Sequence, residues 1–315
     1  MKLVTFDPGH GPRLGALARN WVIDLTLAWE ALLVEQGTMD ATDRAQQELP
    51  SDMLGFLRHP EAMERAQDAL RFVARIAANP STKGPQGAPF VFESEKVKLL
   101  APLPNPTKLG CIGRNYADHC REQGVELPDS PILFAKFNSS IIGPGDPIQL
   151  PAISDLVDFE VELAFVIGRQ GKRISEQEAL DYVAGYTIIN DISARDLQRI
   201  DRQYTRAKSL DTFAPMGPVL VTKDEIPDPN SLGIRLELNG ELMQDSNTSE
   251  MVFSIPYLIS FISQEITLYP GDVFATGTPA GVGFTRQPPV LLKHGDQIAV
   301  EIDGIGRMEN PVIGS

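Results

Sequence analysis

The chain has 315 residues, which is enough for one large domain or two ordinary domains with a substantial core. Its 42% hydrophobic and 22% charged content is typical of a soluble globular protein. A net charge of −14 argues against binding nucleic acid without sequence preference, because that activity needs clustered lysine and arginine. The composition therefore suits an enzyme of small molecules without selecting one.

The chain contains only two cysteines, Cys111 and Cys120, and no C-x-x-C pair. This indicates a reducing compartment and excludes a zinc site made of thiolates. The first residues have neither a long apolar core nor a small-residue cleavage site, and no apolar run reaches the length of a membrane span. We expect a cytoplasmic protein that begins near Met1 and has no membrane partner.

Residues 1–78 have the pattern of a small α/β domain. Two strand patterns come first, with a Gly- and Pro-containing turn between them, at residues 3–6 and 14–24. Three helical patterns follow, at residues 25–35, 51–58 and 60–78. Pro60 suits a first helical position. No cluster of His, Asp or Glu indicates a site here, so we expect an accessory or assembly module.

Residues 79–107 are rich in Pro and Gly and are interpreted as a linker with one short strand, at 90–99. From residue 108 to 315, short apolar runs alternate with turn residues. This favours an α+β, β-rich barrel or sandwich over a doubly wound parallel sheet. Three serines, Ser175, Ser193 and Ser254, are candidates for helix N-caps, and Ser175 would form a capping box with Glu178.

An alternating acidic pattern marks Asp158-Phe159-Glu160-Val161-Glu162. In a strand, alternation places the three carboxylates on one face and the apolar residues on the other. Like charges so close together repel one another and are costly to remove from water, so the pattern favours a bound cation. The alternative is a half-buried strand with a solvated acidic face.

Two further segments carry residues suited to catalysis. His119 and Glu122 share a face if their segment is helical, and the pair is then either a base for activating water or a surface contact. Asp191 follows a β-branched strand and precedes a helix, where ligands and catalytic groups are common but turn residues are too. Arg195 and Gln198 could face the same ligand from the first turn of that helix.

Two lysines and one loop remain open to two interpretations each. Lys208 either stabilises developing negative charge or is solvated, and Lys136 either binds an anion or extends from an apolar run to water. Residues 277–283 are rich in glycine, which indicates a tight loop or backbone amides approaching a carboxylate.

Five ordered motifs together resemble the fumarylacetoacetate hydrolase family over residues 108–315. They are Gly113-Arg114-Asn115-Tyr116-x-x-His119-x-x-Glu122, Asp158-Phe159-Glu160-Val161-Glu162, Asn190-Asp191-Ile192-Ser193-Ala194-Arg195-Asp196, Lys208-Ser209-Leu210-Asp211-Thr212-Phe213 and Gly277-Thr278-Pro279-x-Gly281-Val282-Gly283. Within the family, the N-terminal part, the length and residues 134–140 are most similar to the domain-containing protein 2 group. The resemblance implies the family's mixed β-roll or sandwich catalytic domain, and a homodimer.

The resemblance also implies roles for individual residues. Glu160, Glu162 and Asp191 match ligands of Mg²⁺, or of Mn²⁺ in its place. His119 and Glu122 match the pair that activates water. Five positions match the surroundings of the substrate, namely Tyr116, Lys136, Arg195, Gln198 and Thr278. Lys208 matches the lysine that stabilises the oxyanion.

The chemistry implied is that of a small 2-oxo or 2,4-dioxo acid held as its enolate. We predict a Mg²⁺-dependent hydrolase that cleaves a C–C bond in a 2,4-dioxo acid of the acylpyruvate type. The alternatives are an oxaloacetate tautomerase or decarboxylase, or an isomerase of an unsaturated oxo-diacid in aromatic catabolism. A metal-stabilised dimeric binding protein without turnover is the remaining alternative. The motifs specify the enolate and not the bond broken.

Overall fold

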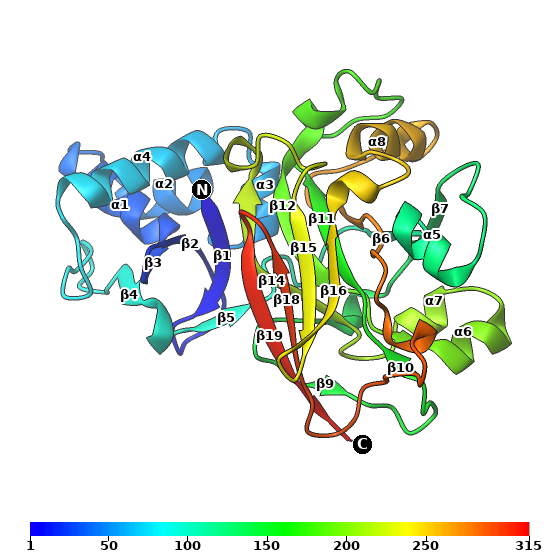
Figure 1. Cartoon of the computed structure of the whole chain (residues 1–315). Coiled ribbons are helices and arrows are strands. Elements are labelled where there is room, and N and C mark those ends of the chain that lie inside the picture. The colour runs from blue at the N-terminus through cyan, green and yellow to red at the C-terminus, as the bar shows by residue number, and fades with distance from the viewer. Residues whose placement is uncertain (315) are drawn as a thin grey trace.

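The computed structural model describes residues 1–314 and contains one large mixed sheet flanked by helices and by a second sheet (Figure 1). The large sheet has twelve strands, and most of them follow the order β4-β3-β2-β1-β14-β12-β11-β17-β6-β7. The second sheet has five strands in the order β16-β15-β18-β19-β9. The predicted α+β, β-rich class is therefore confirmed.

The N-terminal part begins with an antiparallel meander followed by four helices. Its strands are β1 (Lys2–Asp7), β2 (Arg13–Ala18) and β3 (Trp21–Asp24), and its helices are α1 (Leu25–Glu35), α2 (Ala41–Glu48), α3 (Met53–Arg58) and α4 (Ala62–Arg75). These helices lie beside β1–β3, at the left of Figure 1. Helix α1 has the bounds that its pattern predicts.

Two N-terminal predictions were wrong, and one helix was not predicted. The single strand expected at 14–24 is two strands, because Arg19 adopts a φ of 55° and Ala18 pairs with Trp21 across a tight turn. Pro60 lies in the turn before α4 and is not its first residue. Helix α2 was not expected, because it buries only Ala41 and Ala45 and so has no apolar stripe that a pattern could reveal.

The segment interpreted as a linker contributes two strands to the large sheet. These are β4 (Val91–Glu93), which pairs with β3, and β5 (Lys98–Leu100), which pairs with β1. Strand β1 also pairs with β14, opposing Leu3 and Leu220. The domain boundary at residue 107 stays a prediction, but the same sheet continues across it.

The remaining strands come from residues 108–314. They are β6 (Leu109–Gly113), β7 (Ile132–Ala135), β8 (Ile141–Ile142), β9 (Ile148–Gln149), β10 (Val157–Asp158), β11 (Val161–Ile167), β12 (Val183–Asn190), β13 (Ser193–Ala194), β14 (Ala214–Thr222), β15 (Gly233–Leu238), β16 (Glu241–Asn247), β17 (Val273–Ala275), β18 (Gln297–Ile302) and β19 (Gly306–Ile313). Strands β10 and β13 form a separate pair, while β8 joins β14.

Four further α-helices and six 3₁₀ turns complete the described chain. The helices are α5 (Ala117–Gln123), α6 (Arg195–Asp201), α7 (Thr205–Lys208) and α8 (Ile255–Ser263), and the turns are η1 (Ser94–Lys96), η2 (Asn138–Ser140), η3 (Ala179–Tyr182), η4 (Lys223–Glu225), η5 (Thr248–Glu250) and η6 (Gly283–Thr285). Among residues 1–314, no helix is both long and apolar enough to cross a membrane.

The predicted caps had mixed outcomes. Ser254 caps α8 by accepting a hydrogen bond from the Tyr257 amide at 3.4 Å, as expected. Ser175 donates to Glu178 at 2.7 Å, but the chain continues only as η3 before the next strand begins. Ser193 lies in β13 and donates to the Asp191 carbonyl, so α6 begins after Ala194 instead.

The central strands are buried on both faces. Leu163 and Phe165 of β11 pack into a core shared with the second sheet and α8, whereas Ala164 and Val166 pack into a core shared with α1–α4. Every residue of β11 and β12 is buried as a result. Side chains at the ends of these two strands are therefore held in a rigid, largely dry environment.

We predict that Leu3→Ala lowers the free energy of unfolding by about 2–5 kcal/mol, because Leu3 is fully buried where β1 joins β14. Urea unfolding followed by circular dichroism measures the change. Leu127, which is 52% exposed, is the control, and Leu127→Ala should change stability by less than about 0.5 kcal/mol. A separate early transition that leaves the rest of the chain folded would contradict coupling through the continuous sheet.

Candidate functional site

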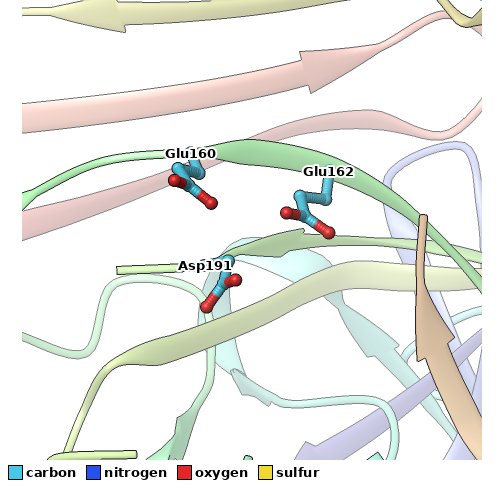
Figure 2. A group of neighbouring side chains, drawn as sticks. All are labelled: Glu160, Glu162 and Asp191. Carbon is cyan, nitrogen blue, oxygen red and sulfur yellow. The ribbon is translucent and has the colours of Figure 1, made fainter. Parts of the chain in front are cut away.

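Three carboxylates converge where β11 and β12 meet. Glu160 precedes β11, Glu162 lies within it, and Asp191 directly follows β12, as the strand-end prediction requires. The Asp191 amide donates to the Glu160 carbonyl at 2.8 Å, which keeps the two chains together at this point. Figure 2 shows the three side chains facing one another, with one oxygen of each within 4.8 Å of the others.

All three carboxylates are buried, with relative exposures of 5%, 1% and 0%. A solvated acidic face is thereby excluded. Burying negative charge is costly unless cations or hydrogen-bond donors compensate it. The partners of each carboxylate therefore decide what the cluster can do.

Glu160 and Asp191 are each paired with cations. The Lys208 ammonium lies 2.7 Å from Glu160 Oε2 and 2.5 Å from Asp191 Oδ2. Lys136 Nζ lies 2.6 Å from Asp191 Oδ1, and Arg195 Nη2 lies 2.6 Å from Glu160 Oε1. These three cations come from different parts of the chain and meet only in the folded protein.

Glu162 is different, because it has no cationic side chain as a partner within residues 1–314. Its Oε2 accepts a hydrogen bond from the Gly277 amide at 2.8 Å. Burial, reinforced by the charges of Asp191 and Glu160, raises the pKa of Glu162 well above its ordinary value. A bound cation would supply the missing positive charge.

For two neighbouring groups, ion pairs outweigh burial in setting the pKa. Burial alone would raise the pKa of Glu160, but Lys208 and Arg195 outweigh burial and lower it to about 2. Burial alone would lower the pKa of Lys208, but Asp191 and Glu160 raise it above its ordinary value. The site thus holds a permanent ammonium beside a permanent carboxylate.

The donor set fits a hard divalent cation. Only carboxylate oxygens converge, without thiolate or imidazole nitrogen among the three, which suits Mg²⁺ or Mn²⁺ better than zinc. Three protein oxygens would also leave coordination positions for water or substrate. The buried triad can therefore hold the metal that the sequence predicts.

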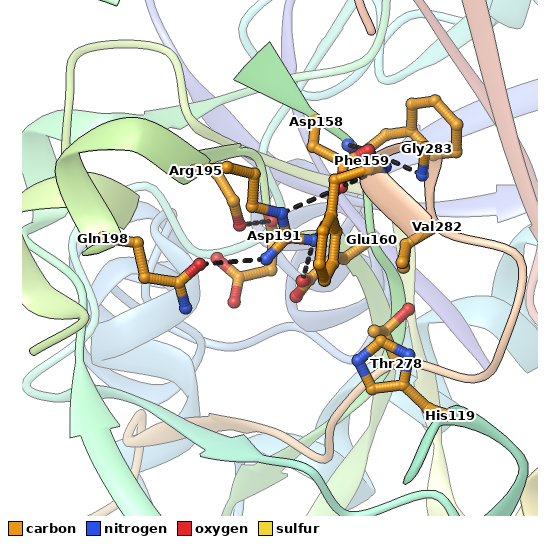
Figure 3. A network of polar contacts seen from close by, with 12 residues as sticks. His119, Asp158, Phe159, Glu160, Asp191, Arg195, Gln198, Thr278, Val282 and Gly283 are labelled. Carbon is orange, nitrogen blue, oxygen red and sulfur yellow. Dashed lines mark hydrogen bonds and ion pairs between the residues drawn. The ribbon is translucent and has the colours of Figure 1, made fainter. Parts of the chain in front are cut away.

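Arg195 is held in place by a network centred on Asp158 (Figure 3). Its Nε donates to Asp158 Oδ2 at 2.9 Å, and its Nη1 donates to Gln198 Oε1 at 3.2 Å. Asp158 Oδ1 also accepts from the Gly283 amide at 2.8 Å, and the Phe284 ring lies 4.3 Å from the Arg195 guanidinium. Asp158 thus connects Arg195 to the glycine-rich loop.

His119 and Glu122 lie on one face of α5, as predicted. His119 Nδ1 lies 3.3 Å from Glu122 Oε2, while Glu122 Oε1 accepts from the Gly281 amide at 2.9 Å. The side-chain amide of Gln123 lies 2.6 Å from His119 Nε2, which identifies Nε2 as the acceptor and Nδ1 as the donor to Glu122. Burial alone would raise the pKa of Glu122, but hydrogen bonds from His119, Thr285 and Gly281 lower it.

Side chains from the triad, from the Arg195 network and from α5 line one cavity of about 290 Å³. It is lined by Ile112, Gly113, Arg114, His119, Gln123, Phe134, Glu160, Glu162, Arg195, Gln198, Arg199, Tyr204, Lys208, Thr278 and Phe284. Of the residues expected near the substrate, Arg195, Gln198 and Thr278 are among them. Tyr116 and Lys136 are not among them, because both are buried, and Lys136 contacts Asp191, which does not line the cavity either.

Sequence reasoning missed two residues of this site. Asp158 belongs to the acidic strand pattern, but nothing in the neighbouring sequence shows whether it orients Arg195 or simply lies at the end of a strand. Gln123 is four residues from His119, a spacing that places both on one helix face and that could have identified it.

The chain is similar in sequence to proteins of one family. Residues 108–313 match the model of the fumarylacetoacetate (FAA) hydrolase C-terminal family. Over 99% of its length the chain is 46% identical to a Bos taurus protein named as a mitochondrial oxaloacetate tautomerase, covering 92% of that protein. The chain is also 40% identical to a Dictyostelium discoideum homolog of fumarylacetoacetate hydrolase domain-containing protein 2. This match covers 99% of the chain and 97% of the relative.

The fold comparison covers the whole chain. A solved structure of maleylpyruvate hydrolase from Sphingobium sp. SYK-6 superimposes with a TM-score of 0.74 at 31% identity, covering 100% of both chains. The predicted fold type and the predicted likeness to the domain-containing protein 2 group are therefore confirmed.

We predict that Mg²⁺ raises the melting temperature and does so more at about pH 8 than at about pH 6. Between the ordinary pKa of Glu162 and its raised value, the folded state binds more protons than the unfolded state. Stability of the metal-free protein therefore falls as pH rises through this window, while the carboxylate that the metal needs becomes available. Scanning calorimetry with and without MgCl₂ measures both effects.

Glu162→Gln should lose the Mg²⁺ effect at both pH values. Glu241→Gln is the matched control, because Glu241 is exposed and lies outside the triad. Equal stabilisation by Mg²⁺ in wild type and Glu162→Gln would contradict the metal assignment.

We predict that Asp158→Asn lowers the free energy of unfolding by about 1–3 kcal/mol, because the buried Arg195 then keeps only Glu160 of its two carboxylate partners. Urea unfolding measures the loss. Asp201→Asn is the control. It breaks the ion pair of Asp201 with Arg206, which is more exposed than the Asp158–Arg195 pair, and should have little effect. Similar stability of the two variants would show that Asp158 does not anchor Arg195.

Proposed function

The chain belongs to the fumarylacetoacetate hydrolase family, and from this premise we propose that it is a Mg²⁺-dependent tautomerase that interconverts the enol and keto forms of oxaloacetate or a similar 2-oxo diacid. One observation carries the proposal: Glu160 and Glu162 of the acidic triad line the same small cavity as the Lys208 ammonium, and Asp191 pairs with Lys208. That combination is suited to an acid whose 2-oxo oxygen becomes negative. The name of the Bos taurus relative selects tautomerisation among the reactions that share this enolate.

Bound Mg²⁺ would supply positive charge that attracts the 2-oxo acid and favours its enolate. Glu160, Glu162 and Asp191 would hold the ion. Their rigid attachment to β11 and β12 means that the site is organised before substrate arrives, which is how electrostatic stabilisation becomes effective.

Lys208 is suited to stabilising the enolate oxygen. An ammonium has three donors, and only two of those of Lys208 are used by Glu160 and Asp191. Lys208 also lines the cavity, so its third donor is available to a bound oxyanion. Its raised pKa keeps it protonated throughout the physiological range.

His119 is suited to moving the proton between C3 of the substrate and the solvent. Glu122 accepts from Nδ1, which leaves Nε2 as the basic nitrogen. To act, Nε2 must exchange its contact with Gln123 for the substrate. A proton then passes from C3 to Nε2, the C3–H electron pair forms the C2–C3 double bond, and the 2-oxo oxygen carries the charge until it is protonated.

Hydrolysis of an acylpyruvate is the second candidate function. It is the reaction that we predict from the sequence motifs alone. It is favoured by the His119–Glu122 pair, which is equally suited to activating water, and by the fold likeness to a maleylpyruvate hydrolase. Decarboxylation of oxaloacetate would use the same enolate. The identity to a protein named as a tautomerase is our reason for proposing tautomerisation before both.

Two further properties stay predictions. A homodimer is expected from the family resemblance, and a cytoplasmic location from the composition. The Bos taurus relative is named as mitochondrial, so location in this chain's own cell needs direct measurement.

The decisive experiment supplies the Mg²⁺-loaded protein with oxaloacetate and, separately, with acetylpyruvate. We expect faster keto–enol conversion of oxaloacetate, followed by the ultraviolet absorbance of the enol, and little release of pyruvate from acetylpyruvate. His119→Ala should slow the conversion at least about a hundredfold if His119 moves the proton. Glu162→Gln should abolish it.

The opposite pattern would favour the second candidate. Rapid release of pyruvate from acetylpyruvate, with no acceleration of the oxaloacetate conversion, would reject the tautomerase and support the hydrolase. No response to either acid would reject both.

A further inference from the structure

Two arginines at the rim of the cavity have no acidic partner among the described residues. Arg114 lies between β6 and α5, and Arg199 lies in α6, one turn after Arg195. Both are exposed and both line the cavity. Within residues 1–314 neither forms an ion pair or donates a side-chain hydrogen bond, whereas the nearby Arg195 contacts Asp158, Glu160 and Gln198.

The two rim arginines belong to an acidic chain. Asp and Glu outnumber Lys and Arg by 42 to 28 in the chain, so acidic partners are plentiful. The inner cations, Lys208 and Arg195, are compensated by Glu160, Asp158 and Asp191. The rim arginines therefore add two positive charges that the protein itself does not neutralise, at the entrance of a cavity in an acidic protein.

The backbone holds Arg114 in position. Its φ of 54° is in the left-handed region, which side chains other than glycine rarely adopt. The turn is anchored by the next residue, because the Asn115 side chain donates to the Thr276 carbonyl at 2.8 Å and accepts from the Phe253 amide at 2.8 Å. Because Asn115 is held by these two hydrogen bonds, the surrounding structure fixes the unfavourable backbone conformation of Arg114.

We propose that Arg114 and Arg199 form a second anion subsite, which binds the distal carboxylate of a 2-oxo diacid. This inference rests on the proposed function, because the 2-oxo acid end must occupy the triad and Lys208. The distal carboxylate of a four-carbon diacid then extends toward the rim. Guanidinium groups suit it, because their donors match the geometry of a carboxylate. The subsite selects 2-oxo diacids over 2-oxo monoacids.

Oxaloacetate and 2-oxobutyrate form a matched pair for the test, because a methyl group replaces the distal carboxylate. Exchange of the C3 protons with deuterium, followed by NMR, measures turnover of both. Arg114→Gln and Arg199→Gln should each raise KM for oxaloacetate about tenfold or more, with little change in kcat. KM for 2-oxobutyrate should stay unchanged. Arg202→Gln is the control, because Arg202 follows the same helix but does not line the cavity.

Binding of unreactive analogues gives a second readout. Malate and 2-hydroxybutyrate differ by the same carboxylate, and calorimetry with Mg²⁺ present should show a preference for malate in the wild type. The double variant should lose this preference and keep its affinity for 2-hydroxybutyrate. An unchanged preference for malate in the double variant would overturn the subsite.

The two proposals fail in different ways. An arginine-dependent preference for malate without exchange at C3 of oxaloacetate would reject the tautomerase and retain the subsite. Exchange at C3 with the same KM in the arginine variants would retain the tautomerase and reject the subsite.

Discussion

The structure depends on compensating the negative charge of three buried carboxylates at the junction of β11 and β12. Glu160 and Asp191 are compensated by lysine and arginine side chains, but Glu162 has only a backbone amide among the described residues. One positive charge is therefore missing from an otherwise balanced cluster. A divalent cation would supply it, and relief of the energetic cost of the cluster would then favour binding of the ion.

The fold keeps this cluster dry. Strands β11 and β12 are covered on one face by the second sheet and α8, and on the other by the core that includes α1–α4. The N-terminal part thus contributes to the environment of the site although it supplies no residue to the cavity lining. Because its strands continue the large sheet, its packing and the stability of the site are linked.

The cavity has an inner and an outer region with different electrostatics. In the inner region, Glu160 and Lys208 are paired with groups of opposite charge and stay ionised at neutral pH, whereas burial raises the pKa of Glu162. In the outer region, Arg114 and Arg199 are exposed and unpaired among the described residues. A 2-oxo diacid matches this division, with a chelating end for the inner region and a second carboxylate for the outer one.

The sequence by itself determined the features that depend on neighbours along the chain. Alternation identified Glu160 and Glu162, helical spacing paired His119 with Glu122, and the strand-to-helix transition marked Asp191, while local chemistry identified the cap at Ser254. It could not determine that Asp158 holds Arg195, that Lys136 contacts Asp191 from outside the cavity, or that 3₁₀ turn η3 replaces a helix after Ser175. These features were decided by the tertiary structure, because each depends on a partner or strand that only folding brings into position.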